Sequence, residues 1–249
     1  MLKTLITTAQ RLTENRSAYR QDLMGRIFHK LLPTPKYVGT FFTKIEIAAL
    51  LAGLSFKTRL LESIDWTDPS KISKINVADL ACGSGTLLKA VLDSFIEKHT
   101  NACIKAGKNS QVKILVKKLI EQNLYGYDIF TSNVHIAAVT LAVHHVETEF
   151  DDIHLHPMPI GSATGDASNP ISLGSLSFFA GKQVSVGVQQ TLSQGTLGPK
   201  NVIAGGKVAV VLPDLHYSIM NPPFTRPAPN ARIYYSIPNE GKVNKELGR

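Results

Sequence analysis

The stretch that decides the fold is KINVADLACGSGTLLKAVLDSFIEKH, residues 74–99. Its first part, KINVADL, is rich in apolar and β-branched residues and predicts a short buried strand. The next five residues, ACGSG, predict a glycine turn, and the remainder has apolar residues at the 3.6-residue spacing of an amphipathic helix. A strand that ends in an acid and leads through a glycine turn into a helix is typical of nucleotide-type binding sites.

Strands and helices continue to alternate after this stretch. The sequence predicts a helix at 112–122, a strand at 123–129, an apolar helix at 132–146 and a strand at 152–160. Strands that alternate with helices in this way form βαβ units, which build a mostly parallel sheet. The sequence therefore predicts an α/β fold.

Two regions depart from this alternation. Residues 1–70 are predicted to be a helical lead-in, in which a glycine-containing turn at 37–44 precedes a helical pattern at 45–54. Residues 161–206 are rich in Gly, Ser, Thr and Gln, and we expect them to form an irregular insertion. Strand character returns at 208–220, immediately before the sequence NPPF.

The composition limits the class of protein. The chain has 249 residues, of which 43% are hydrophobic and 18% charged, so it can bury a sizeable core and is not predicted to be disordered. It contains no run of 18 apolar residues, which argues against a membrane span. The polar N-terminus argues against a secretory signal, and Cys82 and Cys103 form no disulfide framework. We therefore expect a cytoplasmic protein without a membrane partner.

The net charge of +8 is concentrated near the N-terminus, where residues 1–60 contain ten Lys or Arg against three Asp or Glu. A basic segment of this kind indicates a polyanionic partner such as nucleic acid. A solubilising surface explains the same charge equally well.

The first candidate motif is the glycine turn at 79–85, DLACGSG. Its glycines allow the backbone to approach a ligand, and the helix that follows offers free N–H groups at its N-terminus. The motif is not G-x-G-x-x-G and lacks Gly-Lys-Ser/Thr, so it matches neither the dinucleotide fingerprint nor the P-loop. Taken alone, it is equally compatible with an ordinary connection between a strand and a helix.

The second motif is GYDI at 126–129, at the end of the next expected strand. An acid in this position usually holds the ribose hydroxyls of a nucleotide, and the Asp128 carboxylate has enough acceptors for both. The alternative is that Asp128 and Thr131 cap the helix that follows.

The third motif is NPPF at 221–224. Its two prolines fix successive φ angles and donate no N–H, so the Asn221 amide oxygen and the Pro222 carbonyl can act as paired acceptors. Phe224 supplies a flat face beside them. Such a site suits an amino group on a planar ring, whereas a simple Asn-Pro turn is the structural alternative.

The three motifs in this order, each at the end of an expected strand, resemble those of S-adenosylmethionine-dependent adenine-N6 DNA methyltransferases. The resemblance is strongest to modification subunits of type I restriction systems and to related single-chain restriction–methylation enzymes. The segment VGTFFTK at 38–44 is similar to the N-terminal motif of that family. The likeness covers about residues 20–145 and 207–226, and implies a Rossmann-like class I methyltransferase sheet preceded by an N-terminal helical segment. Residues 71–249 would then be the catalytic domain.

The resemblance implies S-adenosylmethionine as cofactor and assigns residues to it. The N-terminal motif would close over the methionine moiety of the cofactor, and the glycine turn would line the methionine side of the cofactor. An acid that follows the third strand would lie near the adenine of the cofactor. The residues implied are Thr40, Phe41, Thr43, Asp79, Ala81, Gly83, Gly85, Asp128, Ile129 and Asp166. The target, an adenine flipped out of DNA, would be received by Asn221, Pro222 and Phe224.

The same motifs are compatible with other functions. An NPPF site also serves N-methylation of a protein glutamine or of an RNA base, and a non-autonomous subunit would act only with a separate specificity or restriction subunit. No metal site is predicted, because His154 and His156 are more simply explained as residues at a strand edge. Amino-group methylation needs no thiolate, so Cys82 is expected to serve packing.

The position of NPPF also constrains the fold. The family sheet has seven strands and this motif follows its fourth, yet only 25 residues follow Phe224. A βαβ unit takes about 30 residues, so we expect an incomplete sheet, truncated after the fourth strand, and a chain that is a fragment.

Overall fold

The computed structural model describes residues 43–57, 59–158, 160–161, 172–179, 184–187, 202–203, 207–210 and 212–222. Most of the predicted helical lead-in, residues 1–42, lies outside these ranges, as do four of the predicted site residues, namely Thr40, Phe41, Asp166 and Phe224.

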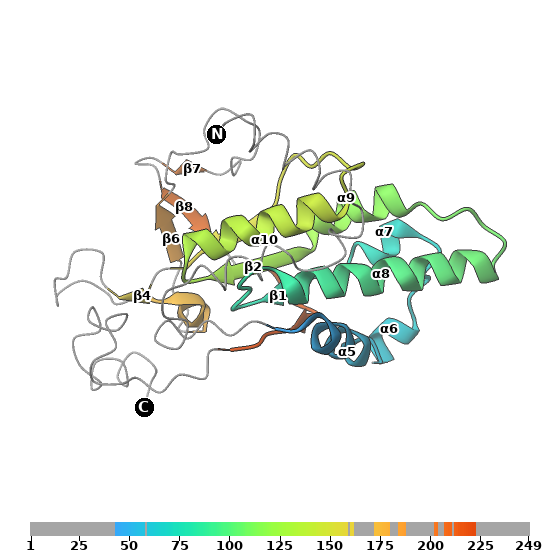
Figure 1. The fold of residues 1–249 in the computed structure, drawn as a ribbon, viewed down its shortest axis with the longest axis horizontal. Helices are drawn as coiled ribbons and strands as arrows, with labels where there is room; N and C mark the ends of the chain where they lie inside the picture. The colour runs from blue at the N-terminus through green and yellow to red at the C-terminus, as the bar shows by residue number, and fades with distance from the viewer. Residues whose placement is uncertain are drawn as a thin grey trace, which may run out of the picture.

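A four-stranded parallel sheet forms the centre of the described fold (Figure 1). Its strands are β1 (Val77–Asp79), β2 (Leu124–Asp128), β3 (His154–Pro157) and β9 (Tyr217–Ser218), in the order β3-β2-β1-β9. The chain moves outward from β1 to β3 and later returns to the other side of β1, where Val77 pairs with Tyr217. The strand order therefore reverses at β1, as in an incomplete Rossmann-like methyltransferase sheet, and the prediction of the fold class is confirmed.

The helices that connect these strands cover one face of the sheet. They are α8 (Thr86–Lys105), α9 (Val112–Gln122) and α10 (Thr131–His144). Both crossovers run in the same direction along the sheet, and the right-handed rule for such connections places their helices on one side. Helix α5 (Ile45–Ser55) packs against α8 (Figure 1), and two short helices, α6 (Arg59–Glu62) and α7 (Pro69–Ile72), lead from α5 to β1.

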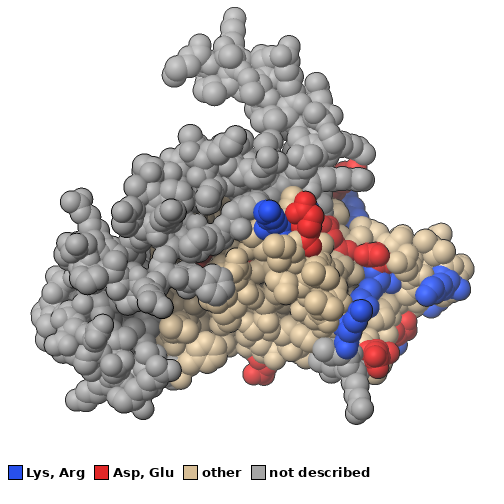
Figure 2. Space-filling model, turned by 60° about the horizontal axis from the view of Figure 1, so that its bottom comes forward, with Lys and Arg blue, Asp and Glu red and all other residues tan. Residues whose placement is uncertain are grey.

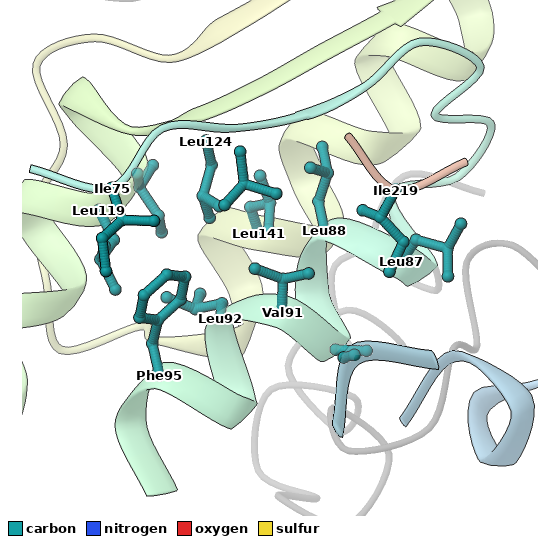
Figure 3. Close-up of a cluster of buried hydrophobic side chains, with 14 of the residues drawn as sticks. Ile75, Leu87, Leu88, Val91, Leu92, Phe95, Leu119, Leu124, Leu141 and Ile219 are labelled. Carbon is teal, nitrogen blue, oxygen red and sulfur yellow. The ribbon is translucent and has the colours of Figure 1, made fainter. Parts of the chain in front are cut away.

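The main hydrophobic core lies between these helices and the sheet. Leu88, Val91, Leu92 and Phe95 of α8 follow one another at helical spacing and are nearly or completely buried. Figure 3 shows this stripe directed toward residues of the neighbouring elements, which include Leu119 of α9, Leu124 of β2 and Leu141 of α10. Because these side chains come from every element around the glycine turn, the core holds that turn in place.

A second, smaller cluster lies around Ala78, Leu80, Tyr127, Met158 and Val210. Ala78 and Leu80 alternate with Val77 and Asp79 along β1 and so belong to the opposite face of the sheet. This cluster receives Val210 from β8 (Lys207–Val210), which forms a separate three-stranded antiparallel sheet with β6 (Val184–Gly187) and β7 (Val202–Ile203). A further pair, β4 (Ile160–Gly161) and β5 (Ser172–Leu173), leads into a 3-10 helix, η1 (Gly174–Phe178).

Two predicted strands differ from those observed. The strand expected at 208–220 is divided into β8 and β9, which belong to different sheets. Pro213 lies between them and cannot donate to a strand ladder, which accounts for the interruption. The strand expected at 152–160 is shorter, because β3 ends at Pro157 and Ile160 pairs in another sheet.

A glycine in the middle of β2 allows close packing of α8 and provides a stability test. A Cβ at Gly126 would contact the Leu155 side chain and would lie 2.9 Å from Leu88 Cδ1. We expect Gly126→Ala to lower the free energy of unfolding by about 1–3 kcal/mol, measured by urea denaturation. The matched control is Gly53→Ala on α5, where a Cβ meets nothing within 4 Å. The control should gain about 0.5–1 kcal/mol. Equal stabilities of the two variants would contradict the close approach.

Candidate cofactor and base-binding site

The glycine turn between β1 and α8 has a backbone that only glycine adopts easily. Gly83 has φ +51° and Gly85 has φ +81°, both in the left-handed region. A Cβ at Gly85 would lie 3.0 Å from the Cα and Cβ of Ala137 on α10, whereas a Cβ at Gly83 would meet nothing within 4 Å. The turn is therefore packed closely on its Gly85 side and has open space beside Gly83.

Hydrogen bonds join this turn to the end of β2. The N–H of Cys82 donates to the Tyr127 carbonyl at 2.9 Å, and the N–H of Gly83 donates to Oδ2 of Asp128 at 2.9 Å. Pairing of β1 with β2 sets these contacts, since Asp79 lies opposite Gly126. The structure thus brings together two motifs that the sequence separates by about 45 residues.

Asp79 is the most unusual group in the site. Its side chain is 1% exposed, and its Oδ1 accepts the Ala81 N–H at 3.0 Å. Its Oδ2 is buried and has no hydrogen-bond partner within the described residues. Burial raises the pKa of Asp79 to about 7, the Ala81 N–H partly offsets this rise, and the nearby Asp128 charge adds to it. An unpaired buried oxygen is costly, so a ligand that donates a hydrogen bond or carries positive charge would be bound favourably here.

Asp128 is already engaged by its own chain. Its Oδ1 accepts from the Phe130 N–H and from the Asn133 amide, both at 2.9 Å, and its Oδ2 accepts from Gly83. Burial raises the pKa of Asp128, and these donors oppose the rise. The Ile129 N–H acts in the same direction, and a carboxylate offers about four acceptor positions, so at most one of them remains. Binding of two ribose hydroxyls would require one of these hydrogen bonds to open.

The structure shows Asp128 at the start of α10, although the N-cap residue is Phe130 rather than Asp128 or Thr131, and binding of the ribose stays a prediction. Phe130 is the N-cap residue of α10, and its N–H is held by Asp128. Asn133, which sequence reasoning did not select, completes this arrangement from the first turn of the helix and is 3% exposed. The sequence signal for Asn133 was a polar amide side chain among the apolar residues of the helix predicted at 132–146. Ile129 follows Asp128 and is half-buried.

Asn221 lies beyond β9, on the other side of β1. The N–H of Ile219 donates to the Ala78 carbonyl at 2.9 Å, which extends the alignment of this strand with β1. Asn221 is half-buried, Pro222 is exposed, and Asn221 Nδ2 donates to Thr43 Oγ1 at 3.1 Å. Asp79, Asp128 and Asn221 thus follow three neighbouring parallel strands at the same edge of the sheet, where ligands bind in α/β folds of this type.

The remaining candidates have structural explanations. The ring of His154 stacks on Tyr125 with centroids 4.9 Å apart, and burial lowers the pKa of His156 to about 4. Within the described part of the chain, no group of three or more His, Cys, Asp or Glu is arranged to hold a metal ion. Cys82 is buried, and burial raises its pKa well above the usual value, so it is a poor nucleophile.

Comparison with known families identifies the wider group. A family model described as N-6 DNA Methylase matches residues 19–157, which is more than half of the chain. The chain belongs to the N-6 DNA methylase family. This confirms the resemblance inferred from the motifs and supports a DNA methyltransferase. The matched region contains Asp79, the glycine turn and Asp128, and it ends before Asn221. No curated protein matches the chain.

The raised pKa of Asp79 predicts a particular dependence of stability on pH. The carboxyl binds its proton more tightly in the folded chain than in the unfolded chain. The contribution of this proton to the free energy of unfolding is therefore complete below about pH 4 and is lost as the pH rises through about 7. Asp79→Asn keeps the shape of the side chain and never carries the charge. We expect the variant to match the wild type near pH 4 and to exceed it by about 2–4 kcal/mol at pH 8 in urea denaturation without ligand. A difference between the two proteins that does not change with pH would refute this assignment.

Proposed function

We propose that the protein transfers a methyl group from S-adenosylmethionine to the exocyclic amino group of adenine in DNA. The observation that carries the proposal is the position of Asn221. It follows β9 at the edge of the sheet where the glycine turn follows β1, and the strand order reverses between these two strands. The family match supports DNA methylation, and it favours DNA over a protein glutamine or an RNA base.

The residues at the glycine turn fit the proposed cofactor. The Oδ2 of Asp79, which has no hydrogen-bond partner among the described residues, suits the amino group of the methionine moiety, and the open space beside Gly83 leaves room for it. Asp128, with Ile129 beside it, is proposed to hold the ribose, and Ala81 and Gly85 to shape the turn around the methionine end. S-adenosylmethionine supplies a methyl group that its sulfonium charge already activates. The chain therefore has to bind and orient that group rather than activate it.

Residues beyond β9 are proposed to act on the target base. An adenine amino nitrogen is a poor nucleophile because its lone pair is delocalised into the ring. Acceptors on Asn221 and on the Pro222 carbonyl would pull on its two N–H bonds and favour a tetrahedral nitrogen. That interaction strengthens as positive charge develops, so it stabilises the transition state more than the ground state. The base must leave the duplex to reach this edge of the sheet, and Phe224 is proposed to stack on it.

The charge distribution bears on the DNA partner. Figure 2 shows that acidic and basic residues are interspersed on the described part of this face and leave a broad uncharged area. Among the described residues, Lys117 pairs with Asp151 at 3.0 Å and with Glu121 at 3.5 Å. Residues 1–60 contain ten Lys or Arg residues, and seven of these lie in residues 1–42. We therefore propose that this basic segment, rather than the described surface, contributes most of the phosphate contacts.

A role in a restriction–modification system, together with a separate specificity or restriction subunit, is part of the same proposal. It rests on the resemblance of the motifs to type I modification subunits. Both cysteines are buried and free, in keeping with the proposed cytoplasmic location. Among the described residues, no helix is long and apolar enough to cross a bilayer.

The proposed role of Asn221 can be tested by methyl transfer. The wild-type chain, supplied with S-adenosylmethionine and DNA of mixed sequence, should yield N6-methyladenine detectable by mass spectrometry. Asn221→Ala should reduce kcat by about 10²–10³-fold because it removes one acceptor of the amino group. Calorimetry should show an almost unchanged affinity for S-adenosylmethionine.

The matched control is Asn101→Ala, a change of the same type on the exposed surface of α8, which should leave transfer unchanged. Equal transfer by Asn221→Ala would refute the role of that residue. Cofactor binding without DNA binding or transfer by the wild-type chain would instead support a non-autonomous subunit.

A further inference from the structure

One contact joins the two ends of the described chain. Asn221 Nδ2 donates to Thr43 Oγ1 at 3.1 Å across 178 positions of sequence. Thr43 immediately precedes the first turn of α5 and Asn221 follows β9, so neither residue is brought to the other by local structure. Both side chains are half-buried.

In this contact the nitrogen end of the Asn221 amide faces Thr43. An asparagine side chain has an oxygen that only accepts and a nitrogen that only donates, on opposite sides of Cγ. With Nδ2 directed at Thr43, Oδ1 is directed elsewhere, and no hydrogen bond to Oδ1 occurs within the described residues. A rotation of about 180° about the terminal torsion would exchange the two ends and would present a donor where the proposed reaction needs an acceptor.

Thr43 is itself held by well-packed structure. Ala48 and Ala52 of α5 are completely buried in the core that α8 shares, and the Ala48 N–H donates to the Lys44 carbonyl at 2.9 Å. Small residues at these positions let α5 lie close to α8 (Figure 1). The helix that begins at the glycine turn therefore also fixes the point from which Thr43 reaches Asn221.

We propose that Thr43 is a positioning residue for methyl transfer, which holds the Asn221 amide with Nδ2 engaged and Oδ1 free to accept from the target amino group. This inference rests on the proposed function and adds a role for Thr43 that is separate from closing over the cofactor. In the structure the hydroxyl accepts from Nδ2, and this contact holds the amide in that orientation before the base arrives.

The inference predicts a specific pattern of kinetic effects in the full chain. Thr43→Val keeps the shape of the side chain and removes the acceptor, and should lower kcat about twofold to tenfold, the usual range for one neutral hydrogen bond. The Kd for S-adenosylmethionine should stay within about twofold. Thr43→Ser keeps the hydroxyl and should restore kcat, and Thr43→Val should have no further effect when Asn221→Ala is already present.

The matched control is Thr140→Val on α10, which removes a buried hydroxyl that has no partner within the described residues. It should leave kcat unchanged. A fall in cofactor affinity with unchanged kcat at saturating S-adenosylmethionine would overturn the inference, because Thr43 would then act on the cofactor alone. Unchanged kcat and unchanged affinity in Thr43→Val would overturn it as well.

A measurement without turnover separates this inference from the proposed function. The side-chain amide protons of Asn221 can be assigned in a ¹⁵N NMR spectrum by their loss in Asn221→Ala. In the wild type one of them should exchange slowly with water, and in Thr43→Val that protection should be lost. The same spectrum in both proteins would overturn the inference even if methyl transfer is confirmed. Loss of protection in a protein without methyl transfer would refute the proposed function and leave the orienting contact standing.

Discussion

The structure depends on the pairing of β1 with parallel strands on both of its sides. β2 lies on one side and β9 on the other, although residues 129–216 separate those two strands in the sequence. Because β2 and β9 lie on opposite sides of β1, the strand order reverses there, and α/β folds bind ligands at the carboxyl edge beside such a reversal. Asp79, Asp128 and Asn221 all lie at that edge.

The electrostatics of this edge are unfavourable without a ligand. Two buried acids lie close enough for the charge of Asp128 to raise the pKa of Asp79, and one oxygen of Asp79 has no hydrogen-bond partner within the described residues. Such an arrangement costs folding free energy and is usually found where a ligand supplies the missing donor or charge. The tight packing of Leu88, Leu92 and Phe95 below the turn stabilises the surroundings and keeps the acids in place.

The sequence predicted a helix or strand correctly where the hydrophobic pattern within that one segment was sufficient to specify it. The strand, glycine turn and helix of residues 74–99 were predicted because hydrophobic spacing and glycine conformation are local properties. Residues 208–220 were predicted as one strand, since their apolar character is continuous except at Pro213. Which sheet each half joins depends on partners distant in the sequence, and the structure assigns β8 and β9 to different ones.

The sequence by itself determined the α/β class, the family and the three motifs, because residue type and spacing carry that information. Tertiary structure decided how the motifs meet. It showed that Asp128 is already engaged by Gly83, Phe130 and Asn133, while binding of the ribose by this residue stays a prediction. It also placed Thr43 against Asn221. Neither result can be read from spacing, since hydrogen bonds across 45 or 178 positions follow from strand order and helix packing rather than from local preference.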